Sequence, residues 1–246
     1  MLFVGTAGWA IPKELADRYA SSESSLRRYA GLLDCSELNS TFYRRHRVST
    51  FERWRDGVPA SFRFSVRLPR AITHWAGLAP PRREVETFFD DAQRLGDKLG
   101  PVLVQLPASV HFEARRAAAF FRLLRQLHDG LVACEPRHAS WYGPEASALF
   151  TEHDIARVVT DPPRPLAANE PIPGSSLLYV RWHASARAHL PAYSDAQLST
   201  LAALVARQPA RVSVWCIFDN TVAGAALYDA LHFQELLSAF RPRVAV

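Results

Sequence analysis

Short apolar runs alternate along the chain with segments whose apolar residues recur every three or four positions. The runs have the length of strands, and the segments between them have the periodicity of helices. We expect eight strands, at residues 2–4, 35–39, 62–66, 102–104, 131–134, 156–159, 177–180 and 212–218. In the second of these, alternation places Cys35, Glu37 and Asn39 on one face.

Helices are expected between most of the strands. Ser49, with Glu52 three residues later, predicts a capping box at the start of a short helix, and Ser194 with Gln197 predicts another. Further helical segments are expected at residues 26–33, 85–99 (ending at Gly100-Pro101), 112–127, 144–153, 198–204 and 222–240. Residues 162–173 are rich in proline and lack periodicity, which is typical of a functional lid or a poorly ordered loop.

Alternating strands and helices predict a parallel sheet, because a parallel neighbour requires a long crossover connection. Eight such units are the number that closes a (β/α)₈ TIM-type barrel, so we expect residues 1–246 to form one barrel domain. An open doubly wound sheet is the alternative fold. It is less favoured because Gly5-Thr6-Ala7-Gly8 matches neither glycine-rich phosphate-binding pattern.

Polar residues gather where the predicted strands end. They are Glu37, Asn39, Arg67, Gln105, Glu135, Arg137, Asp161, Arg181, His183, Asp219 and Asn220. Barrel enzymes place their chemistry at this C-terminal face of the strands. The stretch from Glu37 to Tyr43 is the clearest example, since a carboxylate, a carboxamide, two hydroxyls and a phenol follow one another there.

Composition adds little to this fold and excludes some classes of protein. The 246 residues are 48% hydrophobic and 22% charged, as in ordinary globular proteins. No apolar run approaches the roughly 20 residues of a membrane helix, and the start lacks the basic region of a signal peptide, so we expect a cytoplasmic location. The widely spaced Cys35, Cys134 and Cys216 are interpreted as reduced core residues.

The charge favours an anionic partner only weakly. The formal net charge is +5, and nearly all the 29 basic residues are arginine. Arginine suits bidentate binding of phosphate or carboxylate. A high proportion of arginine can also arise from nucleotide composition alone.

Several motifs, in their order along the chain, resemble the YecE-like family, also called domain of unknown function 72. They are Gly5-Thr6-Ala7-Gly8-Trp9, Glu37 to Tyr43, Phe62 to Val66, Thr73-His74, Gln105-Leu106-Pro107, Glu135 to Trp141 and Arg181-Trp182-His183. The resemblance covers nearly the whole chain. It implies a TIM-type barrel and implies no particular reaction.

The chain departs from the family pattern at four positions. Ala7 replaces a usual serine, Arg67 a usual lysine, Ala184 a common glycine, and Asp219 lies in a segment usually rich in asparagine. Arginine stays protonated and cannot form a Schiff base, so an imine mechanism at position 67 is disfavoured.

Our first hypothesis is an enzyme for a small anionic or polyhydroxylated molecule, such as a sugar or sugar phosphate. Glu37 or Glu135 would be the general base, and His183 or His74 the acid or proton shuttle. The expected substrate-binding residues are Trp9, Asn39, Thr41, Tyr43, Arg67, Gln105, Arg137, Trp141, Asp161, Arg181, Asp219 and Asn220. Asn220 and Thr221, at the start of the last helix, would bind phosphate. The structural alternative is that Glu135 and Arg137 only form ion pairs across the barrel rim.

Two other classes stay open. No organic cofactor is implied, but a divalent metal could be bound by Glu37, Glu135, Asp161, Asp219, His74 and His183. The metal site is not favoured, because the nearby arginines oppose a dication and no short metal motif is present. A nucleic-acid-binding or phosphodiester-cleaving protein is suggested by arginine and by aromatic residues that could stack on bases: Trp9, Tyr43, Trp75, Trp141, Tyr142 and Trp182. The remaining histidines are interpreted as surface or capping residues.

Overall fold

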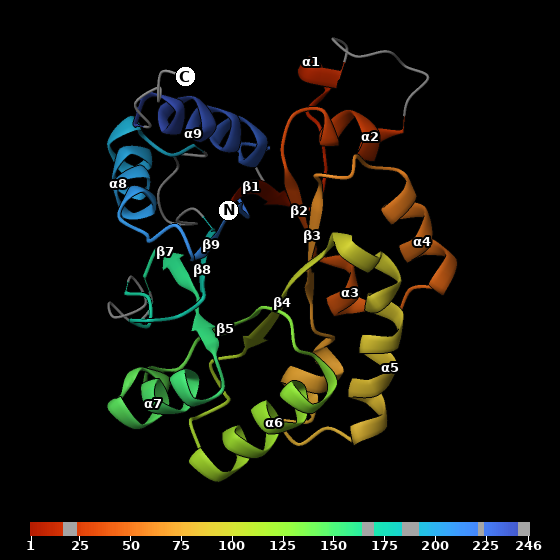
Figure 1. Cartoon of the computed structure of the whole chain (residues 1–246), viewed down its shortest axis with the longest axis vertical. Helices are drawn as coiled ribbons and strands as arrows, with labels where there is room; N and C mark the ends of the chain where they lie inside the picture. The colour runs from red at the N-terminus through yellow and green to blue at the C-terminus, as the bar shows by residue number, and fades with distance from the viewer. Residues whose placement is uncertain (17–23, 164–169, 184–191, 221–223, 241–246) are drawn as a thin grey trace.

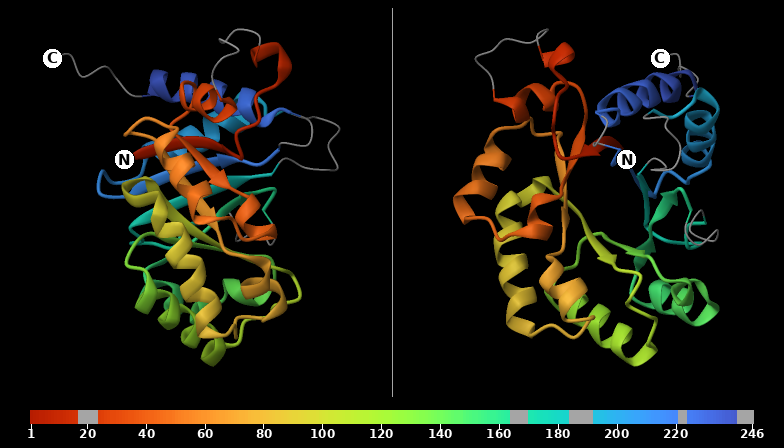
Figure 2. Two further views of the ribbon diagram at one scale, coloured as in Figure 1. Left: turned by 90° about the vertical axis from the view of Figure 1, so that its right-hand side faces the viewer. Right: turned by 180° about the vertical axis from the view of Figure 1, so that it is seen from behind.

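The computed structural model describes residues 1–16, 24–163, 170–183, 192–220 and 224–240, and in these ranges nine parallel strands form one sheet (Figures 1 and 2). The strands are β1 (Leu2–Ala7), β2 (Cys35–Leu38), β3 (Arg63–Arg67), β4 (Leu99–Leu106), β5 (Val132–Pro136), β6 (Ile155–Arg157), β7 (Val159–Asp161), β8 (Leu177–Trp182) and β9 (Ser213–Phe218). The expected parallel sheet is confirmed.

The sheet is a nearly closed barrel. Its order is β6-β5-β4-β3-β2-β1-β9-β8-β7, so β6 and β7 are its two edges. Val158 alone separates these edges in the chain, which brings the two ends of the sheet together. The strand expected at residues 156–159 is therefore divided, because β6 pairs with β5 and β7 pairs with β8. The described structure has nine strands and does not match the expected count of eight.

Helices surround the barrel (Figure 1) and pack along the outside of the strands (Figure 2). They are α1 (Lys13–Ala16), α2 (Ser25–Ala30), α3 (Ser40–Tyr43), α4 (Val48–Asp56), the π-helix η1 (Ala71–Trp75), α5 (Arg82–Ala92), the 3₁₀ helices η2 (Gln93–Lys98) and η3 (Ala139–Tyr142), α6 (Ala114–Leu127), α7 (Pro144–Glu152), α8 (Asp195–Ala206) and α9 (Ala226–Phe240). Within the described ranges, none of these helices has the length and apolar character needed to cross a bilayer.

The connection between β7 and β8 differs from the others. Its described parts, residues 162–163 and 170–176, contain no helix, in agreement with the aperiodic sequence. Residues 164–169 of the expected lid segment lie outside the described residues. Ile172 is buried there and packs against the outer core, so this connection covers part of the barrel where a helix lies elsewhere.

Helix boundaries confirm one predicted cap and overturn another. Ser194 accepts a hydrogen bond from the Gln197 backbone N–H, and the Gln197 side chain binds back to Ser194, so this capping box is present. The box predicted at Ser49 is wrong, because α4 begins at Val48 with Arg47 as its N-cap residue. Ser49 therefore lies inside the first turn and cannot serve as the cap.

Gly100-Pro101 was expected to end a helix, and this prediction is also wrong. Both residues lie in β4, after α5 has ended at Ala92 and η2 at Lys98. A Cβ atom on Gly100 would lie 2.4 Å from the Cη2 atom of Trp215. The glycine is needed because the indole of β9 occupies that space, and its role is close packing between strands.

The chain has two cores. The larger lies between the strands and the surrounding helices. The smaller, which we call the interior cluster, lies inside the barrel and comprises Ala7, Cys35, Leu103, Ala133, Ala156, Val158, Leu177, Tyr179, Trp215 and Ile217. Cys35, Cys134 and Cys216 are buried with free thiols, which confirms the interpretation of the cysteines.

Candidate functional site

Polar side chains replace the interior cluster at the C-terminal end of the barrel. Because side chains alternate between the two faces of a strand, Glu37, Arg67, Gln105, Glu135 and Arg181 all extend into the barrel. Pairing brings them together: Gln105 lies opposite Glu135 in the register of β4 and β5. We call the group formed by Glu37, Arg67, Gln105, Glu135, Tyr179, Arg181, His183 and Asp219 the mouth cluster.

Arg181 lies at the centre of this cluster. Its Nη2 atom is 2.8 Å from Glu37 Oε1 and 2.8 Å from Asp219 Oδ2, and its Nη1 atom is 3.1 Å from Glu135 Oε2. The side chains of Arg181 and Glu37 are 1% and 0% exposed. Burial alone would lower the pKa of Arg181, but the surrounding carboxylates raise it well above its ordinary value. The guanidinium is therefore a permanent charge that neutralises buried carboxylates.

His183 is held between two of the same carboxylates. Its Nδ1 atom lies 2.9 Å from Asp219 Oδ2, and its Nε2 atom lies 3.4 Å from Glu135 Oε1. Burial opposes its charged form, yet the hydrogen bonds to Asp219 and Glu135 outweigh it and raise the pKa of His183. Burial would raise the pKa of each carboxyl, but Arg181 and His183 lower both. Both ring nitrogens of His183 face carboxylates, which favours imidazolium, although the charge of Arg181, whose Nη1 atom lies 3.4 and 3.5 Å from the two nitrogens, opposes it.

Tyr179 and Ser65 belong to the site and were missed from the sequence. Tyr179 donates its hydroxyl proton to Glu37 Oε2 at 2.9 Å, so Ser65 donates to the Tyr179 oxygen across the 2.6 Å contact. Burial, then the charge of Glu37, raises the pKa of Tyr179 far above its ordinary value. Strand parity could have revealed both, because they lie two residues before Arg181 and Arg67.

Arg67 differs from Arg181 in having neutral partners. It donates from Nη1 to Asn39 Oδ1 at 2.8 Å and from Nη2 to Gln105 Oε1, and its Cζ atom lies 3.5 Å from the Phe42 ring centroid. Its Nε atom is buried and has no hydrogen-bond partner among the described residues. Burial, then repulsion by Arg181, lowers the pKa of Arg67. This guanidinium retains donor capacity for an anion.

Two further predicted residues lie beside the mouth cluster. Arg137 donates from Nε to Glu135 Oε1 at 3.1 Å and is 50% exposed, so the predicted rim ion pair is present. His74, on η1, has Nδ1 2.9 Å from the Thr73 hydroxyl and packs edge-on against Phe42. Burial, then the arginines at positions 67, 137 and 70, lower the pKa of His74.

Other predicted residues are directed elsewhere. Trp141 is fully buried, and its Nε1 donates to the Val110 carbonyl at 2.9 Å. Trp9 packs against Trp54 with ring centroids 5.5 Å apart, in the outer core. Trp141 therefore does not reach the mouth cluster, whereas Trp9 also lines a cavity of about 470 Å³ together with Glu37 and Asn39.

The remaining predicted residues have local roles or lie at the edge. The Thr41 hydroxyl lies 2.7 Å from the Leu38 carbonyl oxygen and 2.6 Å from that of Arg67, so it can donate its one proton to either and ties the start of α3 to β3. Tyr43 is 61% exposed on the outer side of the mouth. Asp161, at the end of β7, accepts a hydrogen bond from Tyr193, and burial raises its pKa.

The predicted phosphate site at the last helix is not formed as expected. Asn220 donates from Nδ2 to Asp229 Oδ2 at 2.6 Å, and the helix begins only at Ala226. Thr221, like Ala184 and His189, lies outside the described residues.

A metal site receives no support from the geometry of the carboxylates. Glu37, Glu135 and Asp219 converge on the Arg181 guanidinium, which occupies the position that a cation would take. Within the parts of the chain that the structure describes, no three His, Cys, Asp or Glu side chains are placed to hold a metal ion.

Comparison with known proteins decides the family. A family model described as "Protein of unknown function DUF72" matches residues 3–245. The chain belongs to the DUF72 family. The resemblance inferred from the motifs is thereby confirmed, and several of those motifs supply the mouth cluster.

Relatives of this DUF72 chain agree with its fold. UPF0759 protein YecE of Escherichia coli K12 is 29% identical over 177 residues, which are 70% of this chain and 62% of that protein. This match therefore spans less than two thirds of that relative. A DUF72 protein from Thermotoga maritima is 26% identical, with a TM-score of 0.78 over 97% of this chain and 99% of that one.

A more distant likeness concerns the fold alone. The 3-keto-D-glucoside 4-epimerase YcjR of E. coli is 11% identical, with a TM-score of 0.57 over 97% of the DUF72 chain and 98% of YcjR. At this identity the likeness supports the barrel architecture and assigns no residue.

Proposed function

We propose that this protein is an enzyme that transfers protons to and from a small anionic, polyhydroxylated substrate of the sugar or sugar phosphate class. The single observation that carries the proposal is the mouth cluster. It combines a buried guanidinium that has neutral partners with a histidine whose pKa is raised by its hydrogen bonds to Asp219 and Glu135.

Arg67 and Arg137 supply the anion-binding part of this proposal. Arg67 is 7% exposed and donates to amide oxygens, which an anionic group would replace at a gain in electrostatic energy. Arg137 lies half exposed beside Glu135, at the rim where a substrate would arrive. Arg181, by contrast, is saturated by carboxylates and acts as a positioning residue for them.

His183 supplies the proton-transfer part. It is 23% exposed, more than the carboxylates and the arginine that it contacts in the mouth cluster, so it is the member of this group that a substrate reaches most easily. Its pKa is raised, which favours the protonated ring, and Glu135 and Asp219 stabilise that positive charge until the proton passes to the substrate. Glu37 is fully buried between Arg181 and Tyr179, so its role in this proposal is to position Arg181 rather than to act as a base.

The nucleic-acid alternative has less support. Of the six aromatic residues suggested for base stacking, Trp141 and Trp182 are buried. Of the other four suggested residues, only Tyr43 and Trp75 are largely exposed. Two exposed rings on one side of the barrel do not form a stacking surface across its mouth.

The test is binding and proton exchange with matched variants. Calorimetry with glucose 6-phosphate, ribose 5-phosphate, the free sugars and inorganic phosphate should show tighter binding of the sugar phosphates. Arg67→Gln should weaken it about tenfold or more, because a charge-assisted hydrogen bond contributes roughly 1.5–3 kcal/mol. Arg122→Gln, an equal charge change on the exposed face of α6, should leave binding unchanged.

Catalysis requires a separate readout. In D₂O, a bound substrate that has a carbonyl group should exchange the adjacent carbon-bound hydrogen, with Glu135 accepting that proton and His183 donating its proton to the carbonyl oxygen. The exchange should be lost in His183→Gln, while binding persists. An unchanged affinity in Arg67→Gln would refute the anion site. An unchanged rate of hydrogen exchange in His183→Gln would refute the assignment of His183 as the acid.

A further inference from the structure

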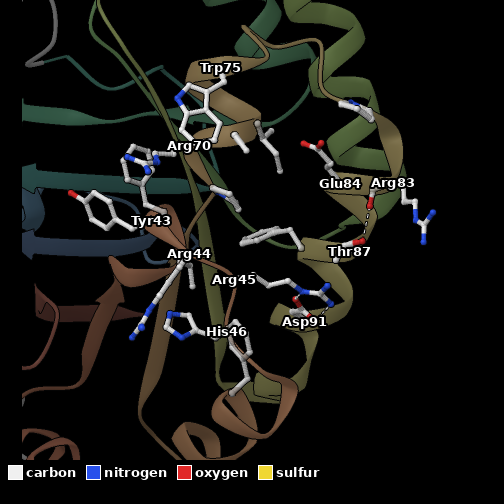
Figure 3. A pocket seen from close by; sticks show the side chains of 18 residues that line it. Tyr43, Arg44, Arg45, His46, Arg70, Trp75, Arg83, Glu84, Thr87 and Asp91 are labelled. Atoms are coloured by element: carbon white, nitrogen blue, oxygen red, sulfur yellow. Dashed lines mark hydrogen bonds and ion pairs between the residues drawn. The ribbon is translucent and has the colours of Figure 1, made fainter.

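A cavity lies outside the barrel, beside the segment that leaves β2. Its volume is about 500 Å³, and residues from α3, α4, η1 and α5 line it (Figure 3). We call it the lateral pocket. Its apolar floor is formed by Phe42, Phe51, Ile72 and Phe88, all of them 8% exposed or less. The volume falls within the range of small-molecule sites in proteins.

The rim of the lateral pocket carries exposed aromatic rings. Trp75 is 71% exposed and Tyr43 is 61% exposed, although large aromatic side chains are normally covered. The Arg70 guanidinium lies over Trp75, with Cζ 4.8 Å from the ring centroid. Figure 3 shows Tyr43, Arg70 and Trp75 side by side at one end of the cavity. This end thus presents two flat apolar faces and a cation.

The charged groups of the pocket leave a positive excess. Arg45 and Asp91 neutralise each other in a two-pronged ion pair, with Nε–Oδ2 at 2.6 Å and Nη2–Oδ1 at 3.1 Å. The other charged residues of the lining are Arg44, Arg70, Arg83 and Glu84, together with His46, whose pKa is lowered by burial and by Arg44. The lining thus holds three further arginines and one further carboxylate. Figure 3 shows Arg44 and Arg83 extending away from the cavity, so Arg70 is the arginine at its rim.

We propose that the lateral pocket binds a small aromatic anion. The ring would enter between Phe42 and Phe88, where apolar surface is removed from water, and the anionic group would bind Arg70 at the rim. Tyr43 and Trp75 would cover the ring from the solvent side. This site does not depend on the function proposed for the mouth cluster, because no residue of that cluster lines it.

Phe42 nevertheless separates the two sites. One face of its ring contacts the Arg67 guanidinium of the mouth cluster, and the side chain also lines the lateral pocket. A ligand could therefore be assigned to the wrong site, so the experiment must distinguish them. Arg67 and Arg70 provide the distinction, since each is an arginine that belongs to one site only.

The probe is 1-naphthyl phosphate, titrated by calorimetry. It should bind about tenfold or more tightly than 1-naphthol, which lacks the charge, and more tightly than inorganic phosphate, which lacks the ring. A naphthylmethyl trimethylammonium ion, with the same ring and opposite charge, should bind most weakly of the naphthyl compounds. Equal binding of the anionic and cationic compounds would overturn the proposal.

Four variants locate the probe. Arg70→Gln should reduce the affinity to that of 1-naphthol. Thr87→Trp should abolish binding, because Thr87 lines the cavity from α5 and an indole there would fill it. Arg67→Gln and the remote Arg122→Gln should retain wild-type affinity. Circular dichroism and thermal unfolding would establish that each variant is folded.

Two outcomes would contradict binding at the lateral pocket. Loss of binding in Arg67→Gln with retention in Thr87→Trp would place the probe at the barrel mouth and refute the lateral site. Tighter binding of a short single-stranded oligonucleotide than of 1-naphthyl phosphate, dependent on Arg70 and fading with salt, would replace the small ligand with nucleic acid.

Discussion

The interior cluster and the mouth cluster are built on the same strands but have opposite chemistry. Leu103 precedes Gln105 on β4, Ala133 precedes Glu135 on β5, and all four side chains extend into the barrel. Two residues further along each strand, an apolar lining becomes an ionic one. Burying such an ionic cluster rarely stabilises a fold more than apolar packing of equal volume would. The difference therefore predicts that the interior cluster contributes more to stability than the mouth cluster, whose role under the proposed function is chemical.

The largest effect is expected where the interior cluster is emptied. Trp215→Ala should lower the free energy of unfolding by about 5 kcal/mol, the upper end for a buried aromatic, because the surrounding strands cannot collapse into the space. Urea denaturation would measure it. Trp75→Ala removes an exposed indole and should change stability by about 0.5 kcal/mol or less. Equal losses in both variants would contradict the assignment of stability to the interior cluster.

Removal of the central cation should have the next largest effect. Arg181→Met leaves Glu37, Glu135 and Asp219 buried without their shared partner, at a cost of about 3 kcal/mol at neutral pH. Because protonation relieves unpaired carboxylates, the deficit relative to the wild type should shrink as the pH falls. A deficit that stays constant from neutral pH to pH 4 would show that the carboxylates are not the cause.

The pH dependence of stability should be smaller and have two limbs. The pKa values of Glu135 and Asp219 are lowered from 4.5 and 3.8, so their contribution is present above these values and is lost as the pH falls below them. The pKa of His183 is raised from 6.5, so its contribution is complete below 6.5 and is lost as the pH rises through the raised value.

Chemical denaturation at a series of pH values would separate the two limbs. His183→Gln should remove the decline above pH 6.5 and leave most of the acid limb in place, because Arg181 also holds Glu135 and Asp219. An unchanged alkaline limb in this variant would assign the decline to another group.

Arg67→Gln should have the smallest effect on stability. Arg67 donates to neutral amides, and burial already opposes its charge, so we expect a change of about 1 kcal/mol or less in either direction. The same variant should lose anion binding at the mouth. A large loss of stability would instead place Arg67 with Arg181 among the residues that hold the cluster together.

Strand parity made much of the mouth cluster predictable. Arg181 and His183 share a face, as do Glu135 and Arg137, and the structure brings both pairs to one place. The same rule also predicts that Tyr179, two residues before Arg181, lies on that face. Parallel strands guarantee this result, because their C-terminal ends meet at one end of a barrel.

Side-chain direction beyond a strand end was not predictable. Trp141 follows β5 closely in sequence, but η3 turns its indole into the outer core against Phe150. The role of Gly100 in β4 depends on its contact with Trp215, which is far away in the sequence. The lateral pocket likewise combines residues from segments whose relative placement is a tertiary property.

Aromatic packing inside the barrel determines where a ligand can enter. Trp215 packs against Phe3, with ring centroids 4.6 Å apart, lies parallel to Tyr179, and fills the space beside Gly100. These rings, with the rest of the interior cluster, fill the barrel below the mouth cluster. A ligand of the mouth cluster would therefore have to enter and leave at the C-terminal end of the strands.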